Sequence, residues 1–294
     1  MDEMKVMEEQ GRAEFEAGAL EKLEALKENL RSYENAIVAF SAGVDSTFLL
    51  NVAHAVLGEK VIAVTTQAAS LPKRDANEAM QFCRQKGIIQ VQMPFDEFEV
   101  EGFAENGPDR CYLCKKAIFT KLLKVASVQG IRTILEGSNA DDMHDYRPGE
   151  KALQEMGIKS PLREVGLTKK EIRFLSREMD LPTWDKPSAA CLASRFAYGE
   201  IISPEKIEMV ERAEQLLLDL GFRTVRVRVH KSLARIEIDQ QDFEKIMVPG
   251  IRERISTTLK TLGFSYVTLD LMGYRRGSLN EELFPEGMPQ EETL

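Results

Sequence analysis

Three of the four cysteines have a spacing that suits sulfur or metal chemistry. Cys111 and Cys114 form a Cys-x-x-Cys pair, whose thiolates can reach one metal centre, and Lys115 and Lys116 beside them favour ionisation. Cys191 stands alone further along the chain. Three thiolates are one ligand short of a closed structural zinc site, and they suit an iron–sulfur cluster that leaves one iron open. Two reduced thiols without a metal are the alternative.

The fourth cysteine, Cys83, is expected to be inert. The helical pattern of Asn77–Lys86 brings it near Ala79, Met80 and Phe82, which predicts a buried thiol. Structural disulfides are not expected, because four cysteines in a reducing compartment are poor candidates for them.

A segment that joins a strand to a helix suits a phosphate group. The apolar run Ala36–Phe40 leads directly into Ser41-Ala-Gly-Val-Asp-Ser46, and an apolar helix follows at once. Such a turn directs backbone N–H groups and the positive end of a helix at one point, and the serine hydroxyls add donors. The candidate nucleotide ligands are Ser41, Gly43, Asp45 and Ser46. The loop has no lysine and so is not a Walker loop; a helix cap without a ligand is the alternative.

A second candidate segment, Glu136-Gly-Ser-Asn-Ala-Asp-Asp142, follows the predicted strand Thr133–Leu135. It therefore lies at the carboxyl end of the sheet, where open α/β folds bind ligands. Carboxylates beside phosphate oxygens suit Mg²⁺, so this segment is a candidate for a nucleotide or Mg²⁺ role. A solvated turn is the alternative for the two aspartates.

Alternating strands and helices must position these segments. Short apolar runs are separated by helical stretches, which predicts an α/β domain with a doubly wound parallel sheet. Before the first strand, helically spaced leucines predict one apolar helix face, and residues 1–19 are predicted to be an added helix or a mobile arm. The predicted strands are Ala36–Phe40, Val61–Thr65, Ile89–Met93 and Thr133–Leu135, and the leucines are Leu20, Leu23, Leu26 and Leu30.

The stretch from Leu181 to Gly199 breaks the alternation and is interpreted as a hinge. After it, Ser203 and a proline begin a helix, and charged and apolar residues then alternate in two strands. This predicts a small α+β domain with one solvated sheet face. The predicted domains are a 1–19 extension, a 20–198 nucleotide domain that ends in the hinge, and a 199–294 domain for substrate binding and oligomerisation.

Composition excludes several classes of function. The chain has 294 residues and a net charge of −9, which argues against a broad basic face for nucleic acid and favours a small-molecule substrate. No apolar stretch is long enough to span a membrane, and the N-terminus is acidic, unlike a signal peptide. We therefore expect a soluble protein in the cytoplasm, without nucleic-acid or membrane partners.

The loop Ser41–Ser46 resembles the signature Ser-Gly-Gly-x-Asp-Ser of the PP-loop ATP pyrophosphatases, which have the adenine nucleotide alpha hydrolase type of fold. These enzymes cleave ATP to AMP and pyrophosphate while they adenylylate a substrate oxygen. Here Ala42 replaces the first glycine. A positive φ at this position would cost alanine about 1 kcal/mol, so we expect a milder backbone or a slightly different phosphate position. ATP and Mg²⁺ are the implied cofactors. The same group has a Gly-x-Asn-x-Asp-Asp run that resembles Gly137–Asp142, which implies that Gly137, Asn139 and Asp141 also bind the nucleotide.

Motifs spread over residues 20–280 resemble the LarE family, the sulfur transferases that build the nickel-pincer cofactor. Members adenylylate carboxylates of pyridinium-3,5-dicarboxylate mononucleotide and convert them to thiocarboxylates. The matching motifs are Asp109–Lys116, Asp145–Gly149, Ala190–Gly199, Val225–His230 and Ala234–Glu237.

The resemblance implies a role for each candidate residue. In one kind of member, the hinge cysteine gives up its own sulfur; in the other, three cysteines hold a [4Fe-4S] cluster whose free iron holds a sulfide. Cys111, Cys114 and Cys191 resemble the second kind, with Cys191 and Asp45 as catalytic residues. Ser194, Arg195, Arg226 and Arg228 are implied to bind substrate, and Glu214 and Glu237 a divalent metal. A homo-oligomer is also implied, with the sulfide donor unknown.

Several alternatives stay open. Without the resemblance, Arg226 and Arg228 fit an ordinary solvated sheet face, although strand periodicity does place them on one side. Related PP-loop functions are an amide-forming synthetase, which would need an ammonia source, and a tRNA thiolase, which should have a basic appendage. A nucleotide-binding protein without activity is the third alternative.

Overall fold

A computed structural model describes residues 2–144, 148–187, 190–275 and 277–278. The chain forms two compact units, and α4 (Arg110–Val128) contains one point of division. No helix among the described residues is long and apolar enough to cross a membrane. The first unit comprises Met1–Gln67, Lys73–Phe95 and Lys115–Ser188; the second comprises Ala68–Pro72, Asp96–Cys114 and Ala189–Leu294.

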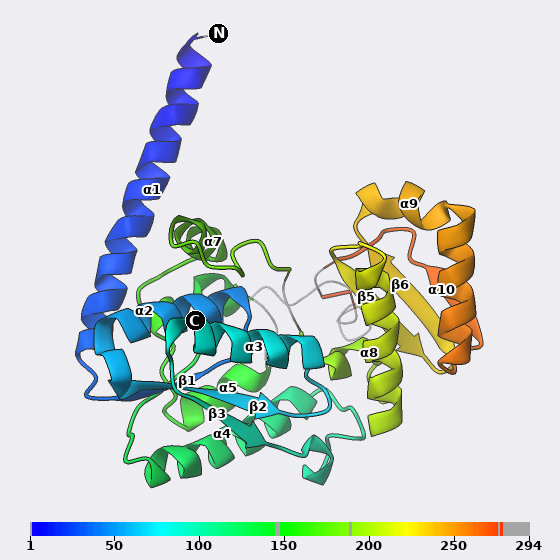
Figure 1. Ribbon diagram of the computed structural model, residues 1–294, viewed down its shortest axis with the longest axis horizontal. Helices are drawn as coiled ribbons and strands as arrows, with labels where there is room; N and C mark the ends of the chain where they lie inside the picture. Colours follow the sequence, from blue (N-terminus) through cyan, green and yellow to red (C-terminus); the bar gives the residue numbers. More distant parts are fainter. Residues whose placement is uncertain (1, 145–147, 188–189, 276, 279–294) are drawn as a thin grey trace, which may run out of the picture. The chain divides into compact units, whose positions relative to one another are not determined.

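A four-stranded, all-parallel sheet forms the centre of the first unit (Figure 1). Its order, β3-β2-β1-β4, confirms the predicted α/β class. Each strand lies within a few residues of its predicted range. The bounds are β1 Ala36–Ala39, β2 Val61–Gln67, β3 Gln90–Pro94 and β4 Ile134–Leu135.

Alternate residues of the central strands enter two separate cores. Ala36 and Val38 of β1 pack with α2 (Val44–Leu57) and α3 (Lys73–Lys86), whereas Ile37 packs with α4. Figure 1 shows α2 and α3 on one face of this sheet and α4 on the other. Both faces are therefore covered, as the continuous apolar runs of the strands predict.

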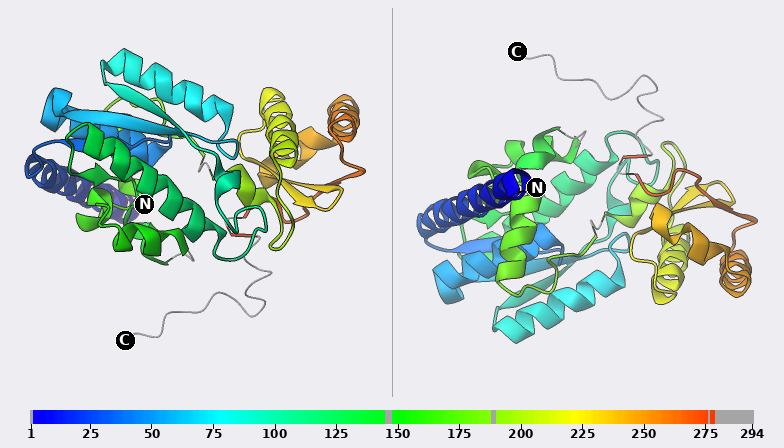
Figure 2. Two further views of the ribbon diagram at one scale, coloured as in Figure 1. Left: turned by 90° about the horizontal axis from the view of Figure 1, so that it is seen from below. Right: turned by 90° about the horizontal axis from the view of Figure 1, so that it is seen from above.

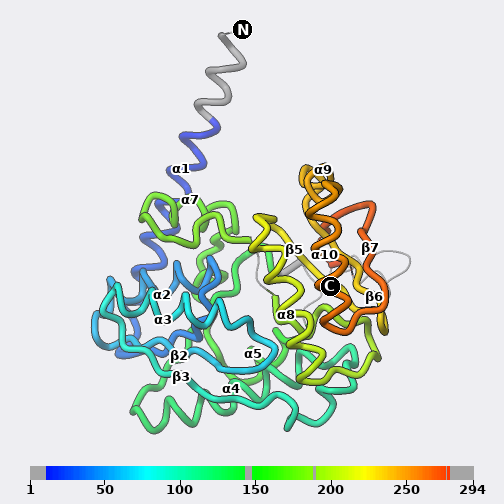
Figure 3. The backbone as a smooth tube through the Cα atoms, turned by 45° about the vertical axis from the view of Figure 1, so that its right-hand side comes forward, coloured from blue at the N-terminus to red at the C-terminus, as the bar shows by residue number. Residues whose placement is uncertain are grey.

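The N-terminal arm and the leucine-rich helix form one helix, α1 (Asp2–Arg31). Figure 3 shows it beside α7 (Lys169–Glu178), in agreement with the contacts between the two. The predicted buried stripe is wrong at its first position, because Leu20 is 51% exposed and Ala19 is fully buried. The 4-3-4 spacing from Ala19 keeps the stripe on one helix face.

The second unit contains a mixed sheet in the order β5-β6-β7, with β5 antiparallel and β7 parallel to β6. Its apolar residues pack with α8 (Pro204–Asp219) and α10 (Pro249–Thr261), which lie on one side of the sheet (Figure 2). Ser203 caps α8 and Pro204 is at its first turn, as predicted. The strands are β5 Val225–His230, β6 Leu233–Ile238 and β7 Tyr266–Leu269.

The prediction that the other, charged face of this sheet is solvated is wrong for its arginines on β5 and for Glu237 of β6, although Tyr266 of β7 is 67% exposed. Arg226 and Arg228 are only 8% and 6% exposed, and Glu237 is fully buried. Charged side chains can be buried in this way when they pair with one another.

The remaining helices are short. They are η1 Gly58–Lys60, η2 Glu97–Glu99, η3 Ala140–His144, α5 Pro148–Glu155, α6 Pro161–Glu164, η4 Leu192–Arg195, η5 Gln240–Asp242 and α9 Phe243–Met247.

Candidate functional site

The predicted phosphate loop lies between β1 and α2. The hydroxyls of Ser41 and Ser46 are 3.1 Å apart, and the backbone N–H of Ser41 points to Ser46 Oγ at 3.4 Å. Gly43 is the N-cap of α2 and no side chain caps this helix. The first N–H groups of α2 and two hydroxyls therefore converge at the start of one helix, which suits an anion.

Ala42 has a positive φ of 55°, so the expected milder backbone is not found. Its carbonyl accepts a hydrogen bond from Lys186 Nζ at 3.0 Å, and the same ammonium pairs with Asp75 at 2.9 Å and with Glu78. Lys186 thus fixes the loop at its strained residue. A left-handed alanine persists where its surroundings hold it in place.

The second predicted segment packs directly on this loop. A Cβ at Gly137 would lie 3.0 Å from the backbone nitrogen of Ser46, so glycine is required for this close approach. Asn139 donates to Asp45 Oδ1 at 3.4 Å, and Asp141 accepts from the backbone N–H of Lys169 at 2.8 Å. The structure therefore brings all seven predicted nucleotide ligands together within the first unit. The seven are Ser41, Gly43, Asp45, Ser46, Gly137, Asn139 and Asp141.

Lys169, which the sequence analysis did not identify, forms an ion pair with Asp45. It is the first residue of α7, whose start is fixed by a capping box between Thr168 and Glu171. Lys22 of α1 pairs with Glu171 at 2.8 Å. The pattern Thr-x-x-Glu ahead of a helix could have indicated this position from the sequence.

The carboxyl group of Asp45 is perturbed. Burial raises its pKa, the positive charge of Lys169 lowers it, and Asp142 raises it again; the net shift is upward. In the protein without bound ligands, the ionised form of Asp45 is therefore disfavoured. A cation near the loop would relieve this cost, which suits Mg²⁺ bound with nucleotide phosphates.

The three predicted cysteines lie in the second unit. Cys114 and Cys191 are half-buried against the apolar core of this unit, and Cys111 is exposed. Cys191 precedes η4, and the next residue donates its backbone N–H to Ser70 O at 2.8 Å. Cys83 is buried in the first unit, where burial raises its pKa to about 11, as expected for an inert thiol.

The three thiols influence one another. Burial and the charges of Cys191, Glu97 and Cys111 raise the pKa of Cys114 to about 12. Burial also raises the pKa of Cys191, and the charge of Cys111 adds to this while Arg110 opposes it. Such thiols ionise when a metal centre binds them. That these three thiols hold an iron–sulfur cluster stays a prediction. Among the described residues, no three His, Cys, Asp or Glu side chains are arranged to hold a single metal ion.

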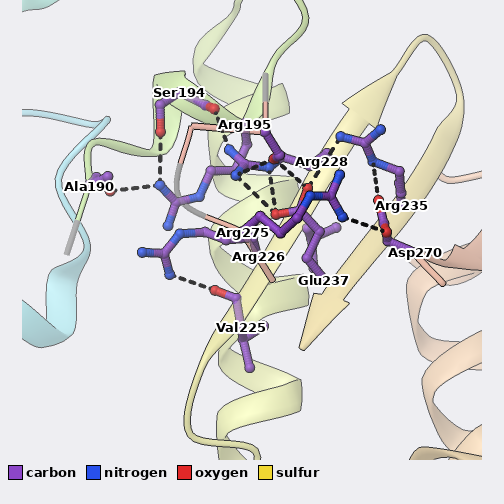
Figure 4. Close-up of polar contacts among 12 residues, drawn as sticks. Ala190, Ser194, Arg195, Val225, Arg226, Arg228, Arg235, Glu237, Asp270 and Arg275 are labelled. Atoms are coloured by element: carbon purple, nitrogen blue, oxygen red, sulfur yellow. Dashed lines mark hydrogen bonds and ion pairs between the residues drawn. The ribbon is translucent and has the colours of Figure 1, made fainter. Parts of the chain in front are cut away.

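Buried arginines gather on the charged face of β5 and β6 (Figure 4). Arg195 binds both oxygens of Glu214, at 2.8 and 2.9 Å. Arg228 binds Glu237 at 3.0 Å and the carbonyl of Ser194 at 2.8 Å. The predicted substrate ligands Ser194, Arg195, Arg226 and Arg228 thus come from η4 and β5 of the same unit.

The carboxylates of this face bind arginines. Glu214 pairs with Arg195, and Glu237 pairs with Arg228 and Arg235 and accepts a hydrogen bond from Ser278 at 2.8 Å. A divalent cation at Glu214 or Glu237 would have to compete with these guanidinium groups, and its presence there stays a prediction.

Arg226 lies among like charges. Burial and then Arg195 lower its pKa to about 10, and its guanidinium lies over the ring of Tyr274 at 5.2 Å. Among the described residues, five arginines and three carboxylates interact on this face. Such a face can bind phosphate and carboxylate groups. The five are Arg195, Arg226, Arg228, Arg235 and Arg275, and the three are Glu214, Glu237 and Asp270.

Some of the predicted motifs lie partly outside the described residues. The described residues omit 145–147 of the Asp145–Gly149 motif and 188–189 of the hinge.

The sequence analysis missed five residues that contact the candidate site residues. These are Lys169, Lys186, Arg110, Tyr274 and Ser278. They lie far in sequence from their partners, except Arg110, which directly precedes Cys111.

Comparison with known proteins gives matches, among them three that cover between 62% and 89% of this chain. No family model matches the chain. An uncharacterized protein from Synechocystis sp. is 39% identical over 265 residues, covering 89% of this chain and 99% of the relative. The pyridinium-3,5-bisthiocarboxylic acid mononucleotide synthase of Lactiplantibacillus plantarum is 36% identical over 255 residues, covering 86% and 92%. A glutamine-hydrolyzing GMP synthase from Archaeoglobus fulgidus, of which one subunit matches, is 25% identical over 199 residues, covering 62% and 63%.

Proposed function

The chain belongs to the LarE family, which includes pyridinium-3,5-bisthiocarboxylic acid mononucleotide synthase, and on this premise we propose that it is an ATP-dependent sulfur transferase. Its substrate is pyridinium-3,5-dicarboxylate mononucleotide, whose carboxylates it adenylylates and converts to thiocarboxylates for the nickel-pincer cofactor. A small mononucleotide with several anionic groups is consistent with the buried arginines of the second unit.

The match to the named synthase is the observation that carries this proposal. It covers 86% of the chain, whereas the match to the GMP synthase covers 62% at lower identity. The longer match favours sulfur transfer over the amide-forming alternative. The tRNA thiolase alternative is disfavoured by the net charge of −9.

The first step is activation of a substrate carboxylate. One carboxylate oxygen attacks the α-phosphorus of ATP, the bond to the β-phosphate oxygen breaks, and pyrophosphate leaves. The N–H groups and hydroxyls of the Ser41–Ser46 loop would hold the phosphates, and Lys169 would supply the positive charge that the loop lacks. Asp45 would hold Mg²⁺ on the phosphates.

The second step forms the carbon–sulfur bond. A sulfur anion attacks the acyl carbon of the adenylate, and AMP leaves with the electron pair of the broken C–O bond. A [4Fe-4S] cluster held by Cys111, Cys114 and Cys191 would supply a metal-bound sulfide as this nucleophile. Of the three cysteines, Cys111 is the exposed one, so substrate would approach the cluster from the side of Cys111.

The alternative source of sulfur is Cys191 itself. Its Sγ would attack the acyl carbon, and removal of the Cα proton would then break the Cβ–Sγ bond. The products are a thiocarboxylate and dehydroalanine at position 191. The half-buried position of Cys191 and its raised pKa disfavour a free thiolate, so we favour the cluster.

The test combines two measurements on the anaerobically purified protein. With ATP and the dicarboxylate mononucleotide, pyrophosphate and AMP should form; ADP and orthophosphate as primary products would reject the assignment. Iron and sulfide analysis should find a cluster. The intact mass should show Cys191 unchanged after turnover, whereas loss of H₂S from Cys191, with Cys111→Ala and Cys114→Ala still active, would establish the sacrificial route.

A further inference from the structure

Arg110 is a buried arginine that takes no part in the steps above. It is the first residue of α4, directly before Cys111, and it is only 5% exposed. A buried guanidinium is normally paired with a carboxylate, because its isolated charge is costly to remove from water. In the part of the chain that the structure describes, no carboxylate lies within ion-pair distance of Arg110.

Its hydrogen bonds go instead to neutral groups and to a thiol. Nη1 donates to the side-chain carbonyl of Asn106 and to Ala193 O at 2.9 Å, and Nη2 donates to Cys111 Sγ at 3.5 Å. Ala193 is two residues from Cys191. The guanidinium therefore connects the segment that contains Cys111 and Cys114 with the segment that contains Cys191.

Asn106 strengthens this connection. It is fully buried with a positive φ of 56°, and its Nδ2 donates to Ala197 O at 2.7 Å and to Phe196 O at 3.3 Å. Its backbone carbonyl accepts from the N–H of Gly199 at 3.0 Å. A neutral amide could make these contacts without any arginine nearby, so they do not account for a positive charge at Arg110.

The charge has a partner if sulfur is anionic at this site. Glu214, a buried carboxylate of this unit, forms an ion pair with Arg195. Glu97, the buried carboxylate among the groups that act on Cys114, accepts hydrogen bonds from the backbone N–H groups of Ser70 and Ala69. Burial lowers the pKa of Arg110, and among the described residues the charges of Cys111, Cys191 and then Tyr198 raise it, so two of the three thiols lie where they can balance its charge.

We propose that Arg110 is a positioning residue for the sulfur centre: it ties the two cysteine-bearing segments together and supplies the fixed positive charge that stabilises anionic sulfur between Cys111, Cys114 and Cys191. The proposal rests on the proposed function for the use of that sulfur. It applies to a cluster and to the Cys191 sulfur alike, since both are anionic when they react.

Two variants separate charge from shape. Arg110→Gln removes the charge but keeps a hydrogen-bond donor, and Arg110→Lys keeps the charge but loses the fork of the guanidinium. Lys124→Gln is the matched control, because it removes one positive charge from an exposed position of the same helix. All proteins are reconstituted anaerobically with iron and sulfide, and their iron content, reduction potential and thermal unfolding midpoint are measured.

Arg110→Gln should lower the reduction potential of the cluster, because a nearby positive charge favours the more negative, reduced form. Its single-turnover sulfur transfer should fall at least about tenfold, as for loss of a charge-assisted hydrogen bond. Arg110→Lys should keep the potential near the wild-type value and transfer sulfur faster than Arg110→Gln. The control should match the wild type. Equal potentials and rates in all proteins, or equal losses in the Gln and Lys variants, would overturn the proposal.

Two further measurements cover the other outcomes. If the wild type binds no iron, the rate at which Cys191 loses its sulfur is measured instead of the reduction potential. This rate should fall in Arg110→Gln but not in Arg110→Lys. Equal rates in the two variants would overturn the proposal. If Arg110→Gln does not fold, Asn106→Asp provides a carboxylate partner for Arg110 and should lower the potential or that rate in the same way. Pyrophosphate release by the wild type is measured separately. If no pyrophosphate is released, the proposed function is rejected, but the proposal for the role of Arg110 is not.

Discussion

Asp45 illustrates how a functional side chain can cost stability. Its carboxyl group is buried in the phosphate loop, and its pKa is raised above the usual value despite the ion pair with Lys169. An acidic group whose pKa is higher in the folded than in the unfolded state contributes most to stability below its unfolded-state pKa. This contribution to the free energy of unfolding is lost as the pH rises through the folded-state pKa. At neutral pH the ionised side chain therefore destabilises the protein without ligands.

Asp45→Asn should consequently raise the thermal unfolding midpoint at pH 7.5, by about 2–4 °C for each kcal/mol gained, while it abolishes pyrophosphate release. The difference from the wild type should shrink as the pH is lowered, because Asp45 in the wild type then becomes protonated. Calorimetry between pH 7.5 and 4.5 measures this, with Glu59→Gln as the control for an exposed carboxylate. A less stable Asn variant at pH 7.5 would contradict the argument.

Arg226 is a better residue than Arg228 for testing whether the charged face of β5 and β6 binds substrate. Arg228 binds the fully buried Glu237, so its loss would also destabilise the protein. Arg226→Ala should remove a charge-assisted contact to substrate worth about 1.5–3 kcal/mol and raise KM roughly tenfold or more. Steady-state kinetics with the mononucleotide measure this, and the exposed Arg223→Ala is the control. Unchanged KM and kcat would leave Arg226 with a structural role only.

At the scale of elements, the start of α7 determines where Lys169 lies. The Thr168 side chain accepts a hydrogen bond from Glu171 N at 3.3 Å, and Glu171 accepts from the backbone N–H of Thr168 at 2.8 Å. Burial raises the pKa of Glu171, but its bonds to Lys22 and Thr168 lower it by more, so the net shift is downward. Its stabilising contribution is therefore present above the ordinary pKa and is lost as the pH falls through the lowered one.

Thr168→Ala should destabilise the protein by about 1 kcal/mol, which is typical for the loss of a helix cap. Because Lys169 follows directly, KM for ATP should also rise. Chemical denaturation and ATP kinetics measure the two effects. Thr120→Ala on an exposed part of α4 serves as the control. If Thr168→Ala is as stable as the wild type but has a raised KM for ATP, the cap positions Lys169 without stabilising the fold. An unchanged KM would show that the position of Lys169 does not affect ATP binding.

Local patterns predicted most elements correctly and failed where distant segments cover a surface. Alternation in β5 gave the strand and the common face of Arg226 and Arg228, but it could not show that this face is buried. The cover comes from Ser194 before the strand and Ser278 well after it. Their contacts with Arg228 depend on the tertiary fold, which a period-two pattern does not contain.

For the whole molecule, motif order identified the family and predicted the residues of the candidate site, and the structure assigns these residues to units. The nucleotide ligands lie in the first unit, while the thiols and arginines lie in the second. The Thr-x-x-Glu pattern could indicate the helix start beside Lys169, but the sequence could not show that Lys169 or Lys186 contacts the loop, because each is more than 120 residues from its contact.

This division predicts that activation and sulfur transfer can be separated by mutation. Cys111→Ala, Cys114→Ala and Cys191→Ala change only the second unit, so each should still release pyrophosphate when ATP and the mononucleotide are present, but form no thiocarboxylate. Asp45→Asn should lose both reactions, because no adenylate forms for sulfur to attack. Pyrophosphate and the thiocarboxylate product are measured in the same anaerobic reaction, and Cys83→Ala, which removes an inert thiol of the first unit, should retain both. If the thiol variants also stop releasing pyrophosphate while remaining folded, activation depends on the sulfur centre, and the two steps cannot be assigned to separate units.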